Sequence, residues 1–492
     1  MEVAAPAALS ERISAVIRID PAAPAIEFAG RQYSWGDLAT TVDAIAAEVT
    51  PGLPVGVILR NTPVHVGALL GVLAAGGCVV TINPHRGVAR TRDDIAELAL
   101  AVIVGTTDDL AELAPGVRRT IAVADLGTVP VVTEHPVAAG AAALRAGVAV
   151  LMLTSGTTGP PKRVELTYAM LERTFQGAKH YERDRSGELR LRRGVAIVNS
   201  PLVHLGGVFR VLQCVVDGRG FVLLPKFEVA AWVDAVRRHR PQAASLVPAA
   251  LRMVLEVDVD PADLASIKAV VCGTAPLGAD EADAFRERFG IPVLTNYAAT
   301  EFGGGVAGWT LPLHQEWWAV KRGSAGRAQP GCQLRVVGDD GTELPTDEVG
   351  VLEVQAAQLD SDEWVRTTDL ARIDADGFLW IVGRADQAII RGGFKVLPDD
   401  VRRALEAHPA VREASVVGLA DARLGAVPAA AVEPAAGAHV DTDELRAHAE
   451  RVLAPYEVPV VIRVIDALPR TESGKPDLVA VRAVLEKRVE EG

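Results

Sequence analysis

Cysteine is scarce in this sequence of 492 residues. The four cysteines, at positions 78, 214, 272 and 332, lie far apart and form no Cys-x-x-Cys pair. That spacing argues against a metal cluster or a disulfide framework. We therefore expect reduced thiols and a cytoplasmic protein.

The sequence also lacks an excess of positive charge, and neither a leader peptide nor a membrane span is expected from it. A net charge of −13 argues against general binding to nucleic acid or anionic membranes, although a local basic pocket stays open. Residues 1–6 hold no basic stretch followed by an apolar core, so no signal peptide is expected. The longest apolar run, residues 66–82, contains Gly76 and Gly77 and predicts a buried helix followed by a strand.

The length and the 49% hydrophobic content predict two to four domains with large buried sheets. Predicted helices at 43–49 and 64–75 alternate with predicted strands at 56–59 and 78–82, a pattern typical of βαβ units in a mostly parallel sheet. Near Arg384 the pattern changes to a compact β/α series of just over a hundred residues. We therefore predict a large domain over 1–384 and a small domain over 385–492.

A loop rich in small hydroxyl residues follows the strand predicted at 148–153. It reads Thr154-Ser155-Gly156-Thr157-Thr158-Gly159-Pro160-Pro161-Lys162. Its backbone N–H and side-chain O–H groups can close around phosphate oxygens, and Lys162 adds a positive charge. Pro161 and the strand-like residues 164–167 exclude a Walker loop, which opens a helix. Taken alone, the run is equally compatible with an ordinary turn.

A second segment, Asn296-Tyr297-Ala298-Ala299-Thr300-Glu301, follows a short strand predicted at 293–294. A carboxylate at a strand end beside a phosphate loop can hold Mg²⁺ against ATP oxygens, and the aromatic ring before it can stack on a purine. Taken alone, a buried tyrosine beside a solvated glutamate is the simpler interpretation.

Together the two segments resemble the acyl-adenylate-forming (ANL) superfamily, which includes acyl-CoA synthetases, peptide-synthetase adenylation domains and firefly luciferase. The second segment resembles the Tyr-Gly-x-Thr-Glu motif, with Ala298 in place of glycine. Gly273-Thr274-Ala275-Pro276 resembles the turn against adenine, with Thr274 replacing a glycine, and Arg163 stands where the family often has glycine. Pro201-Leu202-Val203-His204 resembles the segment whose histidine lies beside the reacting carboxylate.

The resemblance continues to Lys475. Thr367-Thr368-Asp369 resembles Thr-Gly-Asp, which implies that Asp369 binds both ribose hydroxyls, that Arg384 contacts ribose or phosphate, and that Asp386 is the hinge. Gly392 and Gly393 resemble the turn that lines the pantetheine tunnel. The segment ending in Ser473-Gly474-Lys475 resembles a loop whose lysine stabilises the charge that develops as the acyl oxygen attacks phosphorus.

The resemblance implies an α/β fold. It comprises a large N-terminal domain of mixed, mostly parallel sheets with helices and a β-barrel-like subdomain, and a small mobile C-terminal α+β domain. It also implies an ATP-dependent carboxylic acid:CoA ligase that forms an acyl-adenylate, with ATP, Mg²⁺ and coenzyme A as its cofactors and Thr157 and Glu301 at the metal. His204, Thr300, Glu301 and Lys475 are the expected catalytic residues.

The acid is expected to bind near Val208, Phe209, Gly303, Gly304 and Gly305. Small residues there predict room for a fatty, terpenoid, steroid or aryl acid. Three alternatives stay open: transfer to a carrier protein, a non-catalytic acyl- or nucleotide-binding relative, and an oxidative luciferase-like activity. The partners expected are small molecules, and a homodimer is left open.

Overall fold

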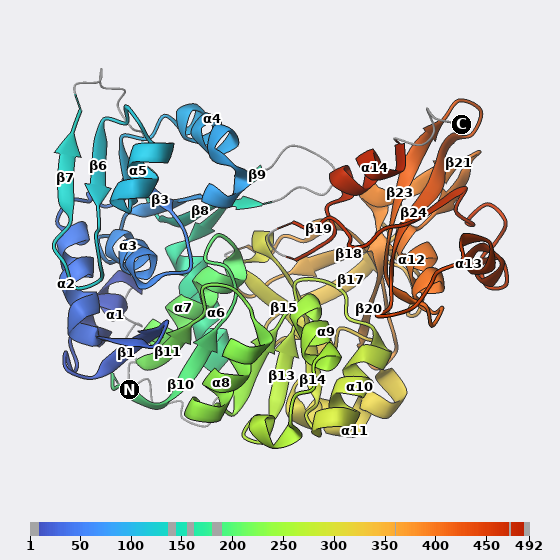
Figure 1. Ribbon diagram of the computed structural model, residues 1–492, viewed down its shortest axis with the longest axis horizontal. Helices are drawn as coiled ribbons and strands as arrows, with labels where there is room; N and C mark the ends of the chain where they lie inside the picture. Colours follow the sequence, from blue (N-terminus) through green and yellow to red (C-terminus); the bar gives the residue numbers. More distant parts are fainter. Residues whose placement is uncertain are drawn as a thin grey trace.

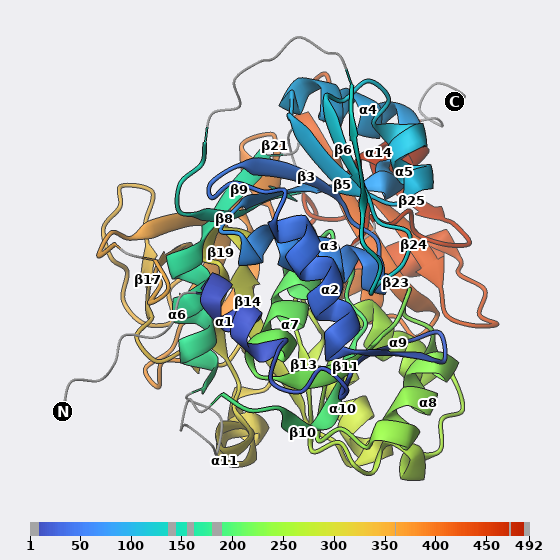
Figure 2. The same ribbon diagram turned by 90° about the vertical axis from the view of Figure 1, so that its left-hand side faces the viewer.

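The computed structural model describes residues 9–135, 144–154, 162–179, 189–359, 361–471 and 474–486. Its first sheet has seven strands in the order β7-β6-β5-β3-β4-β8-β9, with parallel central strands and antiparallel pairing at both edges. The strands are β3 (Pro54–Ile58), β4 (Cys78–Ile82), β5 (Val102–Gly105), β6 (Arg119–Ala122), β7 (Val131–Glu134), β8 (Val148–Thr154) and β9 (Lys162–Thr167). The accompanying helices are α2 (Trp35–Ala46), α3 (Pro63–Ala74), α4 (Val88–Leu98) and α5 (Thr107–Leu113), and Figure 2 shows α2 and α3 side by side.

Two further sheets complete the α/β part of the large domain. One has the order β10-β11-β1-β2 and the other the order β12-β13-β14-β15-β16. Their strands are β1 (Pro24–Phe28), β2 (Arg31–Ser34), β10 (Arg192–Val198), β11 (Arg219–Leu223), β12 (Ala243–Leu246), β13 (Ala269–Cys272), β14 (Val293–Ala299), β15 (Gly304–Gly308) and β16 (Arg327–Ala328). Their helices are α1 (Leu9–Val16), α6 (Tyr168–Lys179), α7 (Leu205–Val216), α8 (Val229–His239), α9 (Pro248–Glu256), α10 (Ala279–Phe289) and α11 (Leu311–Lys321).

An antiparallel four-stranded sheet stands where the barrel-like subdomain was expected. It contains β17 (Gln333–Val337), β18 (Gly350–Gln355), β19 (Val365–Ile373) and β20 (Leu379–Arg384), in that order. The small domain follows, orange to red in Figure 1. It contains β21 (Ile389–Arg391), β22 (Phe394–Val396), β23 (Val411–Asp421), β24 (Gly425–Pro434), β25 (Val461–Val464), α12 (Pro398–Glu406), α13 (Thr442–Ala449) and α14 (Leu478–Glu486).

The cores follow this division. One large cluster of buried apolar side chains joins the first two sheets, a second lies around β12 to β14, and the small domain has clusters of its own. The fold is the expected mixed α/β fold with a large and a small part. The boundary after Arg384 remains our proposal; the sheet that ends with β20 and the sheet that begins with β21 lie on either side of it. No helix in the described part of the chain is long and apolar enough to cross a membrane.

Two predicted elements differ from the structure. The first predicted helix begins at Trp35 rather than at residue 43, because Ser34 and Asp37 form a reciprocal capping box that starts it. The strand predicted at 293–294 extends to Ala299 as β14, since its second half pairs with β15. The segment from Asn296 to Ala299 is therefore held in a sheet instead of following one.

Candidate active site

The loop that carries Lys475 is a closed hairpin resting on the large domain. The Lys475 carbonyl accepts the N–H and the O–H of Thr471, at 2.8 and 3.1 Å. Arg470 closes the hairpin from the other strand by donating to the Gly474 carbonyl at 3.1 Å. A methyl group built on Gly474 would lie 3.7 Å from Cβ of Ala249, in the first turn of α9. The loop thus places Lys475 against the large domain.

Three charged side chains of the large domain act on the Lys475 ammonium. Burial lowers its pKa and Arg384 lowers it further, whereas Asp369 and Glu301 oppose the shift. The residue keeps an exposed surface, but enough protein surrounds the ammonium for the net shift of its pKa to be downward. The structure therefore brings together four of the residues that the sequence singled out: Glu301, Asp369, Arg384 and Lys475.

Asp369 is held by neighbours on two strands. Tyr297 on β14 donates its hydroxyl to Oδ2 at 2.5 Å, and the Asp369 N–H donates to Oγ1 of Thr367 at 3.0 Å. Arg384, paired with Asp369 across β19 and β20, has Nη1 3.7 Å from Oδ1. Burial and then Asp369 raise the pKa of Tyr297, so its hydroxyl stays a donor. A carboxylate fixed in this way can accept hydrogen bonds from a ribose diol.

Glu301 lies in the short helix η3 (Thr300–Phe302), which begins where β14 ends. The residue is exposed. The described residues contain no group of three or more His, Cys, Asp or Glu that could hold a metal ion. A lone exposed carboxylate fits Mg²⁺, which takes its other ligands from nucleotide phosphates and water. Thr157, the second expected metal residue, lies outside the described residues.

The turn after β13 is tightly packed against β14. A Cβ on Gly273 would lie 2.0 Å from Oδ1 of Asn296, so a larger residue there would displace the Asn296 side chain. Thr274, the next residue, has φ +73°, a left-handed conformation in which a β-branched residue is strained. Ala275 follows in the same turn. A glycine at this position would relieve the strain.

Replacing Thr274 with glycine is expected to raise the free energy of unfolding by about 1 kcal/mol. Relief of roughly 1–3 kcal/mol of strain outweighs the greater freedom of an unfolded glycine. Urea unfolding measures the change. Thr368→Gly is the matched control, because Thr368 is an exposed strand residue without a positive φ; it should lose stability. An equal loss in both variants would contradict the assignment of strain.

His204 begins α7 at the end of a segment that Asn61 secures. The Asn61 side chain accepts the Leu202 N–H at 2.8 Å and donates to the carbonyls of Ser200 and Leu224, at 3.1 and 3.2 Å. His204 is the N-cap residue of α7. Asn61 was not predicted from the sequence, although a polar residue just after the buried strand β3 is a signal that could have drawn attention to it.

The glycines expected to leave room for the acid instead allow close packing. A Cβ on Gly303 would lie 2.3 Å from the Met170 sulfur, and one on Gly304 would lie 2.9 Å from Thr174. A Cβ on Gly305 would lie 2.8 Å from the Gln329 amide. The space predicted beside these glycines is therefore filled, because α6 packs directly onto Gly303 and Gly304.

The predicted acid-binding residues of α7 differ in their surroundings. Val208 is fully buried in the core. Phe209 is half-buried and stacks on Phe175 of α6, with ring centroids 5.1 Å apart and planes at 20°. Gly206 is exposed, and a Cβ added there would make ordinary van der Waals contact with Ser200, at 3.9 Å. The exposed Ala298 pairs with Gly305 of β15, directly after a shift in the register of the two strands.

Comparison with known proteins assigns the family. Residues 14–359 match the model of the AMP-binding enzyme family, and residues 401–475 match that of the AMP-binding enzyme C-terminal domain. The chain belongs to the AMP-binding enzyme family. A feruloyl-CoA synthase from Amycolatopsis sp is 30% identical over 93% of this chain and 95% of the relative. An indoleacetate–CoA ligase from Aromatoleum aromaticum is 29% identical over 98% of each.

Solved structures agree on the fold of this AMP-binding enzyme. The o-succinylbenzoate CoA synthetase from Bacillus subtilis, in complex with ATP and magnesium, has a TM-score of 0.80 and 24% identity, covering 96% of this chain and 99% of its own. An amide bond synthetase from Marinactinospora thermotolerans has a TM-score of 0.78 and 28% identity, covering 97% and 99%. The gathered residues and the two relatives named above indicate one class of enzyme, an ATP-dependent acid–thiol ligase.

The predicted phosphate loop of the AMP-binding enzyme joins β8 to β9. Thr154 and Lys162 are register partners, so the two ends of the loop lie opposite each other; Ser155, Gly156, Thr157, Thr158 and Gly159 lie outside the described residues. Arg163 bonds to α4 and β4, with Nη2 2.6 Å from Oδ2 of Asp94 and Nη1 donating to the Thr81 carbonyl at 3.0 Å. It therefore anchors β9 to its neighbours.

The glycine turn of the small domain is exposed in this orientation. Gly392 and Gly393 have φ of +56° and +90°, which favour glycine, and an added Cβ on Gly393 would meet nothing within 4 Å. Asp386, the predicted hinge, forms a bidentate ion pair with Arg384 at 2.9 and 2.7 Å. In this structure Glu301, Asp369 and Arg384 act on Lys475, and the glycine turn lies at the surface.

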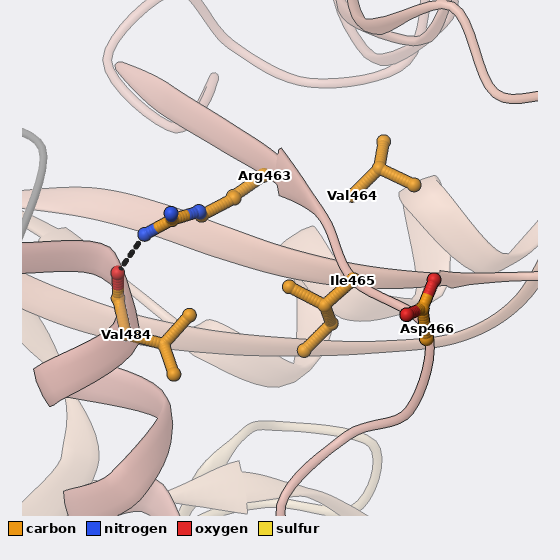
Figure 3. Close-up of a pocket in the computed structure, with 5 residues that line it drawn as sticks. All are labelled: Arg463, Val464, Ile465, Asp466 and Val484. Atoms are coloured by element: carbon orange, nitrogen blue, oxygen red, sulfur yellow. Dashed lines mark hydrogen bonds between the residues drawn. The ribbon is translucent and has the colours of Figure 1, made fainter.

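A cavity of about 440 Å³ lies elsewhere, in the small domain of the AMP-binding enzyme (Figure 3). It is lined by Arg463, Val464, Ile465, Asp466 and Val484. The Arg463 guanidinium donates to the Val484 carbonyl, which ties β25 to α14 (Figure 3). The lining includes none of the predicted site residues, so this cavity is separate from the candidate active site.

Proposed function

We propose that this enzyme is an aryl acid:CoA ligase that works through an acyl-adenylate. The observation that carries the proposal is the meeting of Lys475 with Glu301, Asp369 and Arg384. These groups come from η3, β19, β20 and a loop of the small domain, and such a convergence of charged side chains on a lysine whose pKa is lowered is typical of a catalytic site.

In the first half-reaction a carboxylate oxygen of the acid attacks the α-phosphorus of ATP, and the bond to pyrophosphate breaks. Lys475 stabilises the negative charge that grows on the carboxylate and phosphate oxygens. Asp369 orients the nucleotide through its ribose, and Arg384 limits the movement of that carboxylate. Mg²⁺ held at Glu301 would supply charge neutralisation on the phosphates.

In the second half-reaction the thiol of CoA attacks the acyl carbonyl, and AMP leaves. The small domain would rotate about Asp386, which withdraws Lys475 and brings the turn of Gly392 and Gly393 to the adenylate. The exposed position of this turn supports that order of events, since the turn is accessible for a new contact. The small domain carries both the Lys475 loop and the turn of Gly392 and Gly393, and each serves one half-reaction. A hinge lets each of them reach the active site in its turn.

An aryl acid is favoured over the fatty, terpenoid and steroid acids that the sequence left open. The relatives named above are, by their names, ligases of feruloyl and indoleacetate groups. The Phe175–Phe209 stack offers a flat apolar wall on the helix that His204 begins. The close packing at Gly303 and Gly304 leaves less space for a bulky polycyclic acid.

Arg210 supports an acid with a polar ring substituent. It lies one turn after Gly206 on α7, its Nη1 donates to Gln213 at 2.9 Å, and its buried Nε has no hydrogen-bond acceptor among the described residues. A buried donor of this kind favours a ligand that accepts from it. We place the polar substituent of the acid at Arg210.

Arg210→Met is therefore expected to change selectivity. The ratio of kcat/KM for 4-hydroxy-3-methoxycinnamate to that for cinnamate should fall by about 10-fold, since the polar interaction is lost only with the first acid. Each acid serves as the control for the other. An equal fall for both acids would show that Arg210 supports the fold rather than the choice of acid.

A pyrophosphate-release assay with ATP, Mg²⁺ and a panel of acids, run with and without CoA, tests the proposal. An aryl acid should give release that accelerates with CoA and an acyl-CoA detectable by mass spectrometry. Release without a thioester would favour another acceptor. The amide bond synthetase relative makes an amine the first acceptor to try, followed by a carrier protein.

A further inference from the structure

One face of α9 contacts both the Lys475 loop and the sheet of the small domain. Ala249 lies against Gly474, as described above. Arg252, three residues later, has Nη1 3.6 Å from Oε1 of Glu413 on β23. At the end of the helix, Glu256 forms a bidentate ion pair with Arg412, at 2.7 and 3.0 Å. Figure 1 shows α9 on the side of the large domain toward the small domain.

Glu413 connects this helix to the loop. Arg470 donates to both of its carboxylate oxygens, with Nη1 3.3 Å from Oε1. The same Nη1 donates to the Gly474 carbonyl at 3.1 Å. A continuous series of charge-assisted contacts therefore runs from Arg252 through Glu413 and Arg470 to the residue before Lys475.

The carboxylates in this series are buried, which strengthens their attraction to the arginines. Glu413 and Glu433 are partners on β23 and β24, with side chains 7% and 4% exposed. Two carboxylates side by side in such a place need cations close by. Arg470 and Arg412 come from the small domain, and Arg252 is the cation that the large domain adds.

Arg252 is itself fixed in place. Its guanidinium donates to both carboxylate oxygens of Glu281 on α10, with Nη2 3.2 Å from Oε2, and its side chain is 16% exposed. Because Glu281 belongs to the large domain, Arg252 would keep its place when the small domain turns. Its ion pair with Glu413 and its weaker electrostatic interaction with Glu406 on α12 depend on the orientation of the small domain.

We propose that Arg252 is a positioning residue for Lys475 in the adenylation half-reaction, acting through Glu413 and Arg470. The inference rests on the proposed function. Rotation of the small domain would separate β23 from α9, so Arg252 aligns the lysine in the orientation seen here and has no part in thioester formation.

Arg252→Met in the full-length enzyme tests the inference by separating the half-reactions. Adenylation is measured as pyrophosphate release in a single turnover, and thioester formation is measured from a synthetic acyl-adenylate and CoA. Adenylation should slow on the order of 10- to 100-fold, because a small misplacement of a catalytic group is costly. Thioester formation should stay within about 2-fold of wild type.

A double variant that combines Arg252→Met with Lys475→Ala distinguishes a positioning role of Arg252 from a merely structural one. Arg252→Met should have almost no further effect on adenylation in that background, because Arg252 acts through Lys475. Equal losses in both half-reactions, or an undiminished effect in the Lys475→Ala background, would overturn the inference. Arg237→Met on α8 is the control, since Arg237 is exposed and pairs only within the large domain.

A distance measurement tests the contact without turnover. Spin labels on exposed positions of α8 and α13 should give a narrow distance distribution in wild type and a broader one in Arg252→Met, with Arg237→Met like wild type. An unchanged distribution in Arg252→Met would overturn the inference. A wild type that keeps the narrow distribution but releases no pyrophosphate with any acid would count against the proposed function and leave the contact established.

Discussion

Lys475→Ala should slow acyl-adenylate formation by about 100- to 1,000-fold and spare the transfer of a preformed acyl group to CoA. Glu301, Asp369 and Arg384 act electrostatically on the ammonium, and no other lysine contributes to the interactions described for it. Loss of one preorganised group that stabilises transition-state charge costs about 100- to 1,000-fold in rate. Single-turnover pyrophosphate release measures the first half-reaction, and a synthetic acyl-adenylate with CoA measures the second.

The contrast between the half-reactions is the decisive part of this prediction. A variant that has simply lost its fold would fail in both, so thermal unfolding of Lys475→Ala should match wild type. Val479→Ala serves as a control on the same segment, because its side chain is exposed. Thioester formation as impaired as adenylation would contradict the role given to Lys475.

Asp369→Asn should weaken ATP binding. The substitution keeps the shape of the side chain but removes the charge that holds Tyr297 and faces Arg384. Charge-assisted hydrogen bonds contribute about 1.5–3 kcal/mol each, so the KM for ATP should rise roughly 10- to 100-fold. Asp340→Asn, in an exposed turn, is the control and should bind ATP as wild type does. An unchanged KM would remove Asp369 from the nucleotide site.

The same variant has a signature in the pH profile of adenylation. Lys475 acts in its charged form, which is complete below its pKa and lost as the pH rises through it. Because burial and Arg384 lower that pKa below the ordinary 10.5, the rate should fall at a lower pH than an ordinary lysine would give. Asp369 raises the pKa of Lys475, so the alkaline limb of Asp369→Asn should move to still lower pH. An alkaline limb at the same pH in Asp369→Asn and in wild type would contradict the interaction between Asp369 and Lys475.

Local sequence patterns predicted the elements that carry the site. The strands on either side of the phosphate loop, β8 and β9, were predicted from short apolar runs, which are a local property of the sequence. The turn after β13 likewise lies where the sequence placed it. The family resemblance then pointed to Lys475, Asp369 and Arg384, which the fold does bring together.

Contacts between distant segments could not be predicted from the sequence. Tyr297 bonds to Asp369 across 72 positions, and Arg252 meets Glu413 only because two domains pack together. Such pairs depend on tertiary packing, which leaves no local period or spacing in the chain. Gly303 and Gly304 were predicted to leave space for the acid, but a glycine can also allow close packing. Here α6 packs directly against both glycines, which the sequence alone does not show.

The central claim is that one active site first adenylates an aryl acid and then makes its CoA thioester. The most direct measurement follows pyrophosphate, AMP and acyl-CoA together in one reaction of enzyme, ATP, Mg²⁺, CoA and 4-hydroxy-3-methoxycinnamate. The account predicts equal amounts of all three products, formed about 100- to 1,000-fold more slowly by Lys475→Ala. Pyrophosphate and AMP without an acyl-CoA from any aryl acid, in the presence of CoA, would contradict it.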